Sequence, residues 1–186
     1  MRKLGVYNSV SLDGYFTDKN NDMSWAHKND PEWTSFVAGN ASGGGVLVFG
    51  RITYEMMASH WPTARARQQN PEVADAMNAL PKIVFSRSLD RAEWSNTTLV
   101  KDDIVGAMRK LKAQPGPDMV IMGSGTIVSQ FTEAGLIDEY QIVVNAIVLG
   151  AGRTLFDGMK KRASLALQKT RSFKNGNVVL WYTPAA

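Results

Sequence analysis

A charged residue stands where an apolar run gives way to a helical pattern. The run Leu47–Gly50 reads LVFG, and Arg51, Ile52 and Thr53 follow it directly. Arg51 therefore falls at the positive end of the predicted helix dipole, where a cation is mildly unfavourable unless an anion joins it. The free N–H groups of a first helical turn attract such an anion. Residues 50–53 are a candidate phosphate-binding junction, with the alternative that the glycine only makes the turn.

A second junction of the same kind follows the apolar segment at 119–122. Its residues are Gly123, Ser124, Gly125 and Thr126, again glycines and hydroxyls at a predicted helix start. Two such junctions facing one crevice suit a pyrophosphate, because ligands of open α/β sheets bind beyond the carboxyl ends of the strands. The order of residues matches neither a Walker A loop nor the G-x-G-x-x-G fingerprint.

A polar triplet, Ser86, Arg87 and Ser88, follows the apolar segment at 82–85. Two hydroxyls and a guanidinium bind a phosphomonoester well, although an exposed polar turn is the simpler interpretation. Arg51 and Arg87 fall at the ends of strands that we expect to be neighbours. Two arginines converging on one phosphate would select NADP over NAD.

Acid–base candidates are few. Asp30 and Glu32 begin a predicted helix, where either is a cap or first-turn acid, or a group that binds a heterocycle and relays a proton. Trp25, Trp33 and Phe36 would give such a ring an apolar wall, although core packing is the commoner use of these residues. The two histidines lack metal-ligand spacing, so we expect no metal site. The sequence holds no Gly-x-Ser-x-Gly elbow, which disfavours a hydrolase.

A frame of alternating strands and helices must position these residues. Helices are expected from about Asp30 or Pro31, from Arg51, and after a polar loop within the stretch 63–81. Two more are expected, one capped by Asp102 and ended at 115–116, the other over 126–135. Strands are predicted at 3–12, 46–50, 82–86, 97–100, 118–125 where the strand runs into glycines, 138–150 as one strand or two short ones, 165–173 and 177–183.

The closing pair of strands forms a hairpin around Asn175-Gly176. Strands that alternate with helices and finish in an antiparallel pair predict an α/β fold: a mixed, mostly parallel, twisted sheet flanked by helices. The absence of any linker, repeat or low-complexity tract predicts a single domain over residues 1–186.

Composition limits the classes of function. The chain has 186 residues, of which 44% are hydrophobic and 20% charged, as in a globular protein. No apolar run could span a membrane, no secretory signal is visible, and the lack of cysteine fits a reducing cytoplasm. The net charge of +4 comes from scattered residues. It suits ordinary surface chemistry or a phosphorylated small ligand better than nucleic acid.

Taken together, these motifs resemble the dihydrofolate reductase superfamily, and within it the branch of the riboflavin-biosynthesis reductase domain. The matching stretches are SVSLDGYF, VLVFGRITYE, IVFSRSL, VIMGSGTIVSQFTEAGLIDEYQIVVNAIVLGAGRTLF and the final hairpin. They extend over almost the whole chain, and their combination is specific although each motif alone is weak.

The resemblance implies an NADPH-binding reductase that is often a homodimer. Ser9, Val10, Asp13 and Gly14 match the strand end and loop beside the nicotinamide. Phe156 matches a position near the substrate cavity. The diphosphate and 2′-phosphate positions match the following residues: Gly50, Arg51, Ile52, Thr53, Ser86, Arg87, Ser88, Gly123, Ser124, Gly125, Thr126 and Ile127.

The implied reaction is hydride transfer from NADPH to a small heterocycle of the pterin or aminopyrimidine type. It resembles that of 5-amino-6-(5-phosphoribosylamino)uracil reductase in riboflavin biosynthesis. Trp25 and Asp30 reproduce the short interval between the tryptophan and the pterin-binding acid of true dihydrofolate reductases, whereas Glu32 better fits the spacing to Phe36. The acid is therefore open between Asp30 and Glu32. The alternative function is a non-catalytic nucleotide- or phosphate-binding module that retains the fold.

Overall fold

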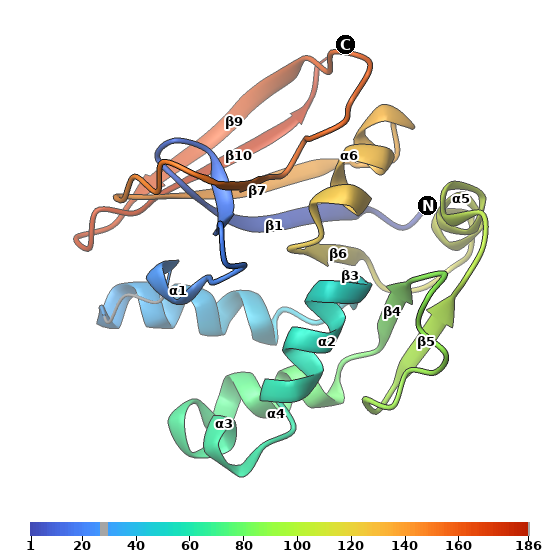
Figure 1. Ribbon diagram of the computed structural model, residues 1–186, viewed down its shortest axis with the longest axis horizontal. Coiled ribbons are helices and arrows are strands. Elements are labelled where there is room, and N and C mark those ends of the chain that lie inside the picture. Colours follow the sequence, from blue (N-terminus) through green and yellow to red (C-terminus); the bar gives the residue numbers. More distant parts are fainter. Residues whose placement is uncertain (27–29, 186) are drawn as a thin grey trace.

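An eight-stranded sheet forms the centre of the computed structural model, which describes residues 1–26 and 30–185 (Figure 1). The strand order is β5-β4-β3-β6-β1-β7-β10-β9. The first six of these run parallel, and β10 pairs antiparallel with both β7 and β9. The strands are β1 (Leu4–Ser11), β3 (Val46–Gly50), β4 (Lys82–Phe85), β5 (Thr97–Val100), β6 (Met119–Met122), β7 (Glu139–Asn145), β9 (Leu165–Ser172) and β10 (Val178–Pro184). The predicted fold class is confirmed.

Helices cover both faces of this sheet (Figure 1). On one face, buried side chains of β3 and β4 pack against α2 and α4, and those of β7 and β10 pack against α1. On the other face, α5 and α6 cover the centre of the sheet. Central strands such as β3 and β4 consist mainly of apolar residues, because both of their faces are buried. The helices are α1 (Pro31–Ser42), α2 (Arg51–His60), α3 (Ala64–Gln69), α4 (Pro71–Ala79), α5 (Ile104–Ala113) and α6 (Gly125–Glu133).

Several local predictions hold, and others need correction. Helix α1 begins as expected, with the Asp30 carboxylate accepting a hydrogen bond from the Trp33 N–H at 2.8 Å. The stretch expected to be a polar loop contains α3, because Thr63 caps it by accepting from the Ala66 N–H. The cap of α5 is Asp103, with φ of +41°, rather than Asp102.

A second, two-stranded sheet of β2 (Tyr15–Asp18) and β8 (Gly152–Thr154) was not predicted. Its two short strands come from loops far apart in the sequence, after β1 and after β7. The C-terminal hairpin is confirmed, and Gly176 in its turn has φ of +88°. In the described part of the chain, every helix is too short or too polar to cross a membrane.

A buried cation fastens α5 to the start of the sheet. Lys112, at the end of α5, is 8% exposed and donates from Nζ to the Leu136 carbonyl at 2.5 Å. The same ammonium pairs with the carboxylate of Asp138. Asp138 also accepts from the Leu4 N–H at 2.7 Å. One carboxylate therefore joins the end of α5, the segment before β7 and the first residue of β1.

Candidate functional site

The predicted phosphate-binding segments meet at one edge of the sheet. Gly50 ends β3, the polar triplet 86–88 follows β4, and the junction 123–127 follows β6. These strands are neighbours, with Gly50 opposite Phe85 and Val48 opposite Ile121. Because neighbouring parallel strands end on the same side, the segments lie next to one another. Strand β1, which pairs with β6, brings Ser9 and Val10 to this edge too.

Reciprocal hydrogen bonds join the two glycine junctions. The Gly50 N–H donates to Ser124 Oγ at 2.7 Å, and the Ser124 N–H donates to Thr53 Oγ1 at 3.1 Å. Each hydroxyl thus satisfies the backbone of the opposite junction. The starts of α2 and α6 are held in a fixed relation by these two bonds.

Close contacts explain two glycines of the second junction. A Cβ on Gly123, whose φ is +61°, would lie 2.7 Å from Thr53 Oγ1. A Cβ on Gly125 would lie 2.9 Å from the Thr154 carbonyl and 3.0 Å from the Phe16 ring. These distances leave no room for a Cβ. Glycine is therefore required at 123 by the opposite junction, and at 125 by Phe16 of β2 and Thr154 of β8.

Helices α2 and α6 begin without a side-chain cap. Neither has an acidic residue in its first turn. In contrast, side chains of Asp30, Thr63 and Asp103 cap α1, α3 and α5, and α4 starts with a proline and Glu72. Among the described α-helices, α2 and α6 are therefore the two whose first turns have neither a side-chain cap nor an acidic residue, which suits an external anion.

The Arg51 guanidinium does have a partner within the chain. Its Nη1 lies 2.9 Å from Glu55 Oε2, one helical turn further along α2. The two side chains are 43% and 47% exposed. Glu55 is a further charged residue at this junction that was not predicted from the sequence, although its spacing of four residues from Arg51 is typical of a helical ion pair.

The triplet after β4 divides into a structural part and an exposed part. Ser86 Oγ accepts from the N–H groups of Ser88 at 3.2 Å and Leu89 at 3.0 Å, so this hydroxyl builds the turn. Arg87 and Ser88 are exposed, and Arg87 makes no ion pair with a described residue. The guanidinium of Arg87 is thus available to a ligand.

Two further residues at this edge were missed from the sequence. Lys101 is exposed directly after β5, whose Val100 carbonyl accepts from the Ser86 N–H at 3.0 Å. Lys101 therefore adds a positive charge beside the triplet. Asn8, buried in β1, donates from Nδ2 to the Gly123 carbonyl at 3.1 Å and so supports the second junction. The positions of Lys101 and Asn8 depend on which strands pair, and this pairing cannot be deduced from the sequence.

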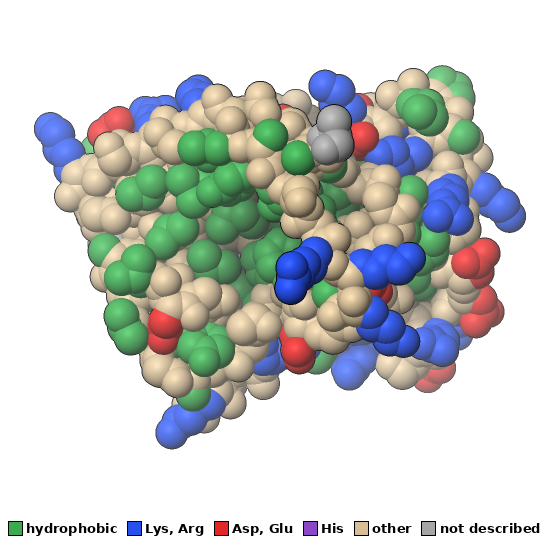
Figure 2. Space-filling model, turned by 90° about the horizontal axis from the view of Figure 1, so that it is seen from above, with side chains coloured by type: hydrophobic (Ala, Val, Ile, Leu, Met, Phe, Trp, Pro, Cys, Tyr) green, Lys and Arg blue, Asp and Glu red, His purple; other side chains and the backbone are tan. Residues whose placement is uncertain are grey.

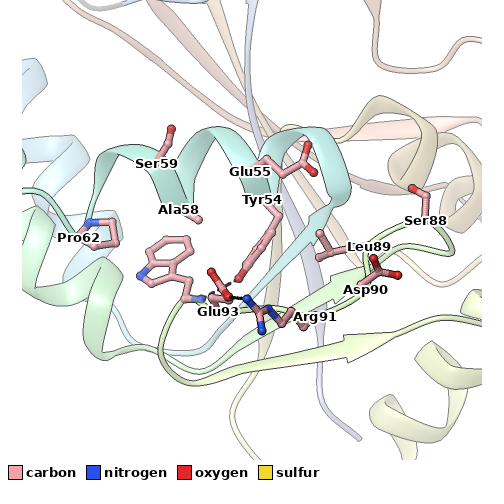
Figure 3. A pocket seen from close by; sticks show the side chains of 11 residues that line it. Tyr54, Glu55, Ala58, Ser59, Pro62, Ser88, Leu89, Asp90, Arg91 and Glu93 are labelled. Atoms are coloured by element: carbon pink, nitrogen blue, oxygen red, sulfur yellow. Dashed lines mark hydrogen bonds and ion pairs between the residues drawn. The ribbon is translucent and has the colours of Figure 1, made fainter.

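An open groove of about 640 Å³ runs along α2 beside the loop that follows β4 (Figure 3). At its floor, the Trp94 N–H donates to the Tyr54 hydroxyl at 2.9 Å. Glu55 and Ser88 lie toward the end of the groove nearer to the start of α2 (Figure 3). The groove thus opens beside the Arg51 junction.

Asp13 ties two loops together next to β1. Its carboxylate hydrogen-bonds Ser11 and accepts from the N–H groups of Leu149 and Gly150, the latter at 2.7 Å. These bonds, that with Ser11 foremost, lower the pKa of Asp13 to about 2. Gly14, with φ of +89°, completes the turn. Asp13 therefore shapes this loop and stays charged in mild acid.

The two candidate acids are both engaged in other contacts. Asp30 caps α1, as described above, and Glu32 lies 2.9 Å from Arg171 on β9, both half-exposed. His27, next to these residues in the sequence, lies outside the described residues. Within the described chain, no group of three or more metal-ligating side chains is found.

The three candidate substrate-binding aromatics are not brought together. Trp25 lies in a short 3-10 turn, Ser24–Ala26, and its Nε1 donates to the Asp22 carbonyl. Phe36 packs beneath α1 against Trp33, Phe173 and Trp181. Phe156 is 39% exposed and neighbours Tyr140, which belongs to the cluster under α5 and α6. Phe36 and Phe156 therefore lie on opposite faces of the sheet.

Comparisons with known proteins agree with this architecture. The family model of the RibD C-terminal domain matches residues 2–180. An uncharacterized protein of Bacillus subtilis (strain 168), YyaP, is 27% identical over 182 residues, which are 97% of this chain and 94% of YyaP.

Solved structures show the same fold. A Shewanella sp. PV-4 protein, assigned provisionally to riboflavin biosynthesis, is 26% identical with a TM-score of 0.78, over 99% of both chains. A diaminohydroxyphosphoribosylaminopyrimidine deaminase/5-amino-6-(5-phosphoribosylamino)uracil reductase of Thermotoga maritima has a TM-score of 0.71 at 14% identity. That match takes in 99% of this chain and 57% of the Thermotoga protein.

Proposed function

The chain belongs to the RibD C-terminal domain family, and we propose that it is an NADPH-dependent reductase acting on a small heterocyclic substrate. One observation carries the cofactor assignment. Two helices start at neighbouring strand ends, hydrogen-bonded to each other, without a cap or a first-turn acid. This arrangement suits a diphosphate, and Arg87 and Lys101 suit an additional phosphate beside it.

In this proposal each segment of the edge takes one part of the cofactor. The first turns of α2 and α6, at 50–53 and 123–127, hold the diphosphate. Arg51 and the triplet 86–88 hold the 2′-phosphate, with Lys101 adding positive charge. Ser9 and Val10 of β1 lie beside the nicotinamide in this proposal, together with Gly14 in the loop that the Asp13 carboxylate fixes.

Bound NADPH would supply the hydride, and the protein would supply orientation and electrostatics. The substrate class is a pterin- or aminopyrimidine-like ring, with Trp25, Phe36 and Phe156 retained as candidate contacts. Asp30 or Glu32 would assist proton delivery from water. Either acid must first release a present partner, the Trp33 N–H or Arg171. Reduction of 5-amino-6-(5-phosphoribosylamino)uracil is the specific reaction to test.

The existing contacts of Asp30 and Glu32 also favour a second candidate function, that of a nucleotide-binding module without catalysis. The two functions separate in one assay. A reductase lowers NADPH absorbance when a pterin or aminopyrimidine acceptor is added, whereas a binding module binds NADPH and leaves it unoxidised with every acceptor.

Arg87→Ala is expected to weaken NADPH binding about tenfold, because charge-assisted hydrogen bonds to phosphate contribute roughly 1.5 to 3 kcal/mol. NADH, which lacks the 2′-phosphate, should lose less than about twofold. Fluorescence titration of the purified protein measures both affinities. Arg91→Ala is the matched control, since Arg91 is 82% exposed and pairs with Glu93.

Equal losses for the two cofactors on Arg87→Ala would refute the 2′-phosphate assignment. Absence of NADPH binding by the unaltered protein at near-millimolar concentration would refute the proposed function as a whole.

We also propose a homodimer, because one apolar face of the sheet is only partly covered. Ile142 and Leu180 are paired neighbours on β7 and β10, and Tyr182 pairs with Leu167, which is 54% exposed. Figure 2 shows hydrophobic side chains gathered over the half of the molecule that holds β7, β9 and β10. Such faces usually meet another protein surface. Sedimentation equilibrium should give twice the 20.4 kDa of one chain, and a single-chain mass at micromolar concentration would contradict it.

A further inference from the structure

The Arg51–Glu55 pair places opposite charges at the start of α2. Their atoms are 2.9 Å apart, and both side chains are about half exposed. Exposed pairs of this kind contribute little net stability, so a ligand can compete with either partner. Glu55 also lines the groove, in the same end as Ser88 (Figure 3). A ligand phosphate that reached Arg51 and Ser88 would therefore meet a carboxylate as well.

Arg51 and Glu55 would favour different forms of the adenosine ribose. An arginine accommodates the 2′-phosphate of NADP, whereas a carboxylate accepts a hydrogen bond from the 2′-hydroxyl of NAD. A dinucleotide site normally shows one of these groups. Here both lie one helical turn apart and in contact with each other.

We infer that Glu55 is a specificity-determining residue, which lowers the preference for NADPH and lets the site accept NADH. This inference rests on the proposed dinucleotide-binding function. With NADPH, the carboxylate repels the dianionic 2′-phosphate and competes with it for Arg51. With NADH, the carboxylate neutralises Arg51 and accepts from the ribose hydroxyl.

Other charged residues of the groove do not share this position. Glu93 pairs with Arg91 at 2.6 Å, with side chains 70% and 82% exposed. Both residues, and Asp90 before them, belong to the loop after β4 rather than to the helix start. Glu93 therefore offers a matched control, because it is a groove carboxylate that also pairs with an arginine.

The experiment compares Glu55→Gln with Glu93→Gln and measures the dissociation constants of NADPH and NADH by fluorescence titration. Glu55→Gln should tighten NADPH about fivefold, since a carboxylate–phosphate repulsion at the surface is about 1 kcal/mol. It should weaken NADH about threefold, the size expected for one exposed hydrogen bond. Arg51→Ala should weaken the binding of NADPH more than that of NADH. It should therefore shift the ratio of the two affinities in the direction opposite to Glu55→Gln. The Glu93→Gln variant should leave the ratio of the two affinities unchanged.

Added salt provides a second readout, because screening weakens exposed charge interactions. The gain in NADPH affinity on Glu55→Gln should shrink as salt is raised. An unchanged NADPH/NADH ratio in Glu55→Gln, or an equal change in Glu93→Gln, would overturn the inference while leaving dinucleotide binding intact. Failure of the unaltered protein to bind either dinucleotide would overturn the proposed function together with it.

Discussion

Replacing Gly123 with alanine is expected to weaken dinucleotide binding at least tenfold and to destabilise the fold. The new Cβ would lie 2.7 Å from Thr53 Oγ1 and 2.9 Å from Thr53 Cγ2, so the two junctions must separate. Overpacking of this kind costs roughly 1 to 3 kcal/mol, in addition to about 1 kcal/mol for alanine at positive φ. Once the starts of α2 and α6 move apart, their N–H groups can no longer bind the same diphosphate. Titration with NADPH and urea denaturation measure the two effects.

Gly135 provides the control for backbone strain. Its φ is +64°, almost that of Gly123, but no atom lies within 4 Å of its added Cβ. Gly135→Ala should therefore lower the free energy of unfolding only by the backbone strain of alanine at positive φ, and it should leave the affinity for NADPH unchanged. If both variants bound NADPH as well as the unaltered protein, the contact between the junctions would have no part in binding.

Removal of the Asp138 carboxylate is expected to lower the free energy of unfolding by about 3 kcal/mol, because it leaves the buried Lys112 ammonium without its counter-ion. Asp138→Ala also removes the acceptor of the Leu4 N–H. Lys112→Met should cost less, since the Asp138 side chain is 40% exposed and can hydrate. Urea denaturation measures both losses.

The Arg67–Asp75 pair is a suitable comparison. Its side chains are 60% and 68% exposed, so Asp75→Ala should cost less than about 1 kcal/mol. A loss for Asp138→Ala no larger than that for Asp75→Ala would show that the buried pair contributes no more to stability than an exposed one.

The sequence was most informative where structure follows from local order. Alternating strands and helices implied parallel strands, and parallel strands bring Gly50, the triplet after β4 and Gly123 to one edge. The cap of α1 was equally local, because Asp30 and Pro31 are adjacent. The cap of α5 was not local in this sense, because two consecutive aspartates, Asp102 and Asp103, can each cap a helix and only the backbone turn decides between them.

What the sequence could not disclose depends on contacts between distant segments. The hydrogen bond between Ser124 and Thr53 joins residues 71 positions apart. The small sheet of β2 and β8 forms between two loops that have no strong pattern of their own. The aromatic residues Phe36 and Phe156 look equivalent in the sequence, and only sheet topology puts them on opposite faces.

The two hydroxyl bridges between the junctions have a consequence for the thermodynamics of ligand capture. Because hydrogen bonds to Ser124 Oγ and Thr53 Oγ1 already fix the starts of α2 and α6, an anion that binds there does not have to order a flexible loop. The loss of conformational entropy occurs when the chain folds and not when the ligand arrives. Such a preorganised cradle retains more of its interaction energy as affinity, and its affinity varies together with the stability of the sheet edge that holds it.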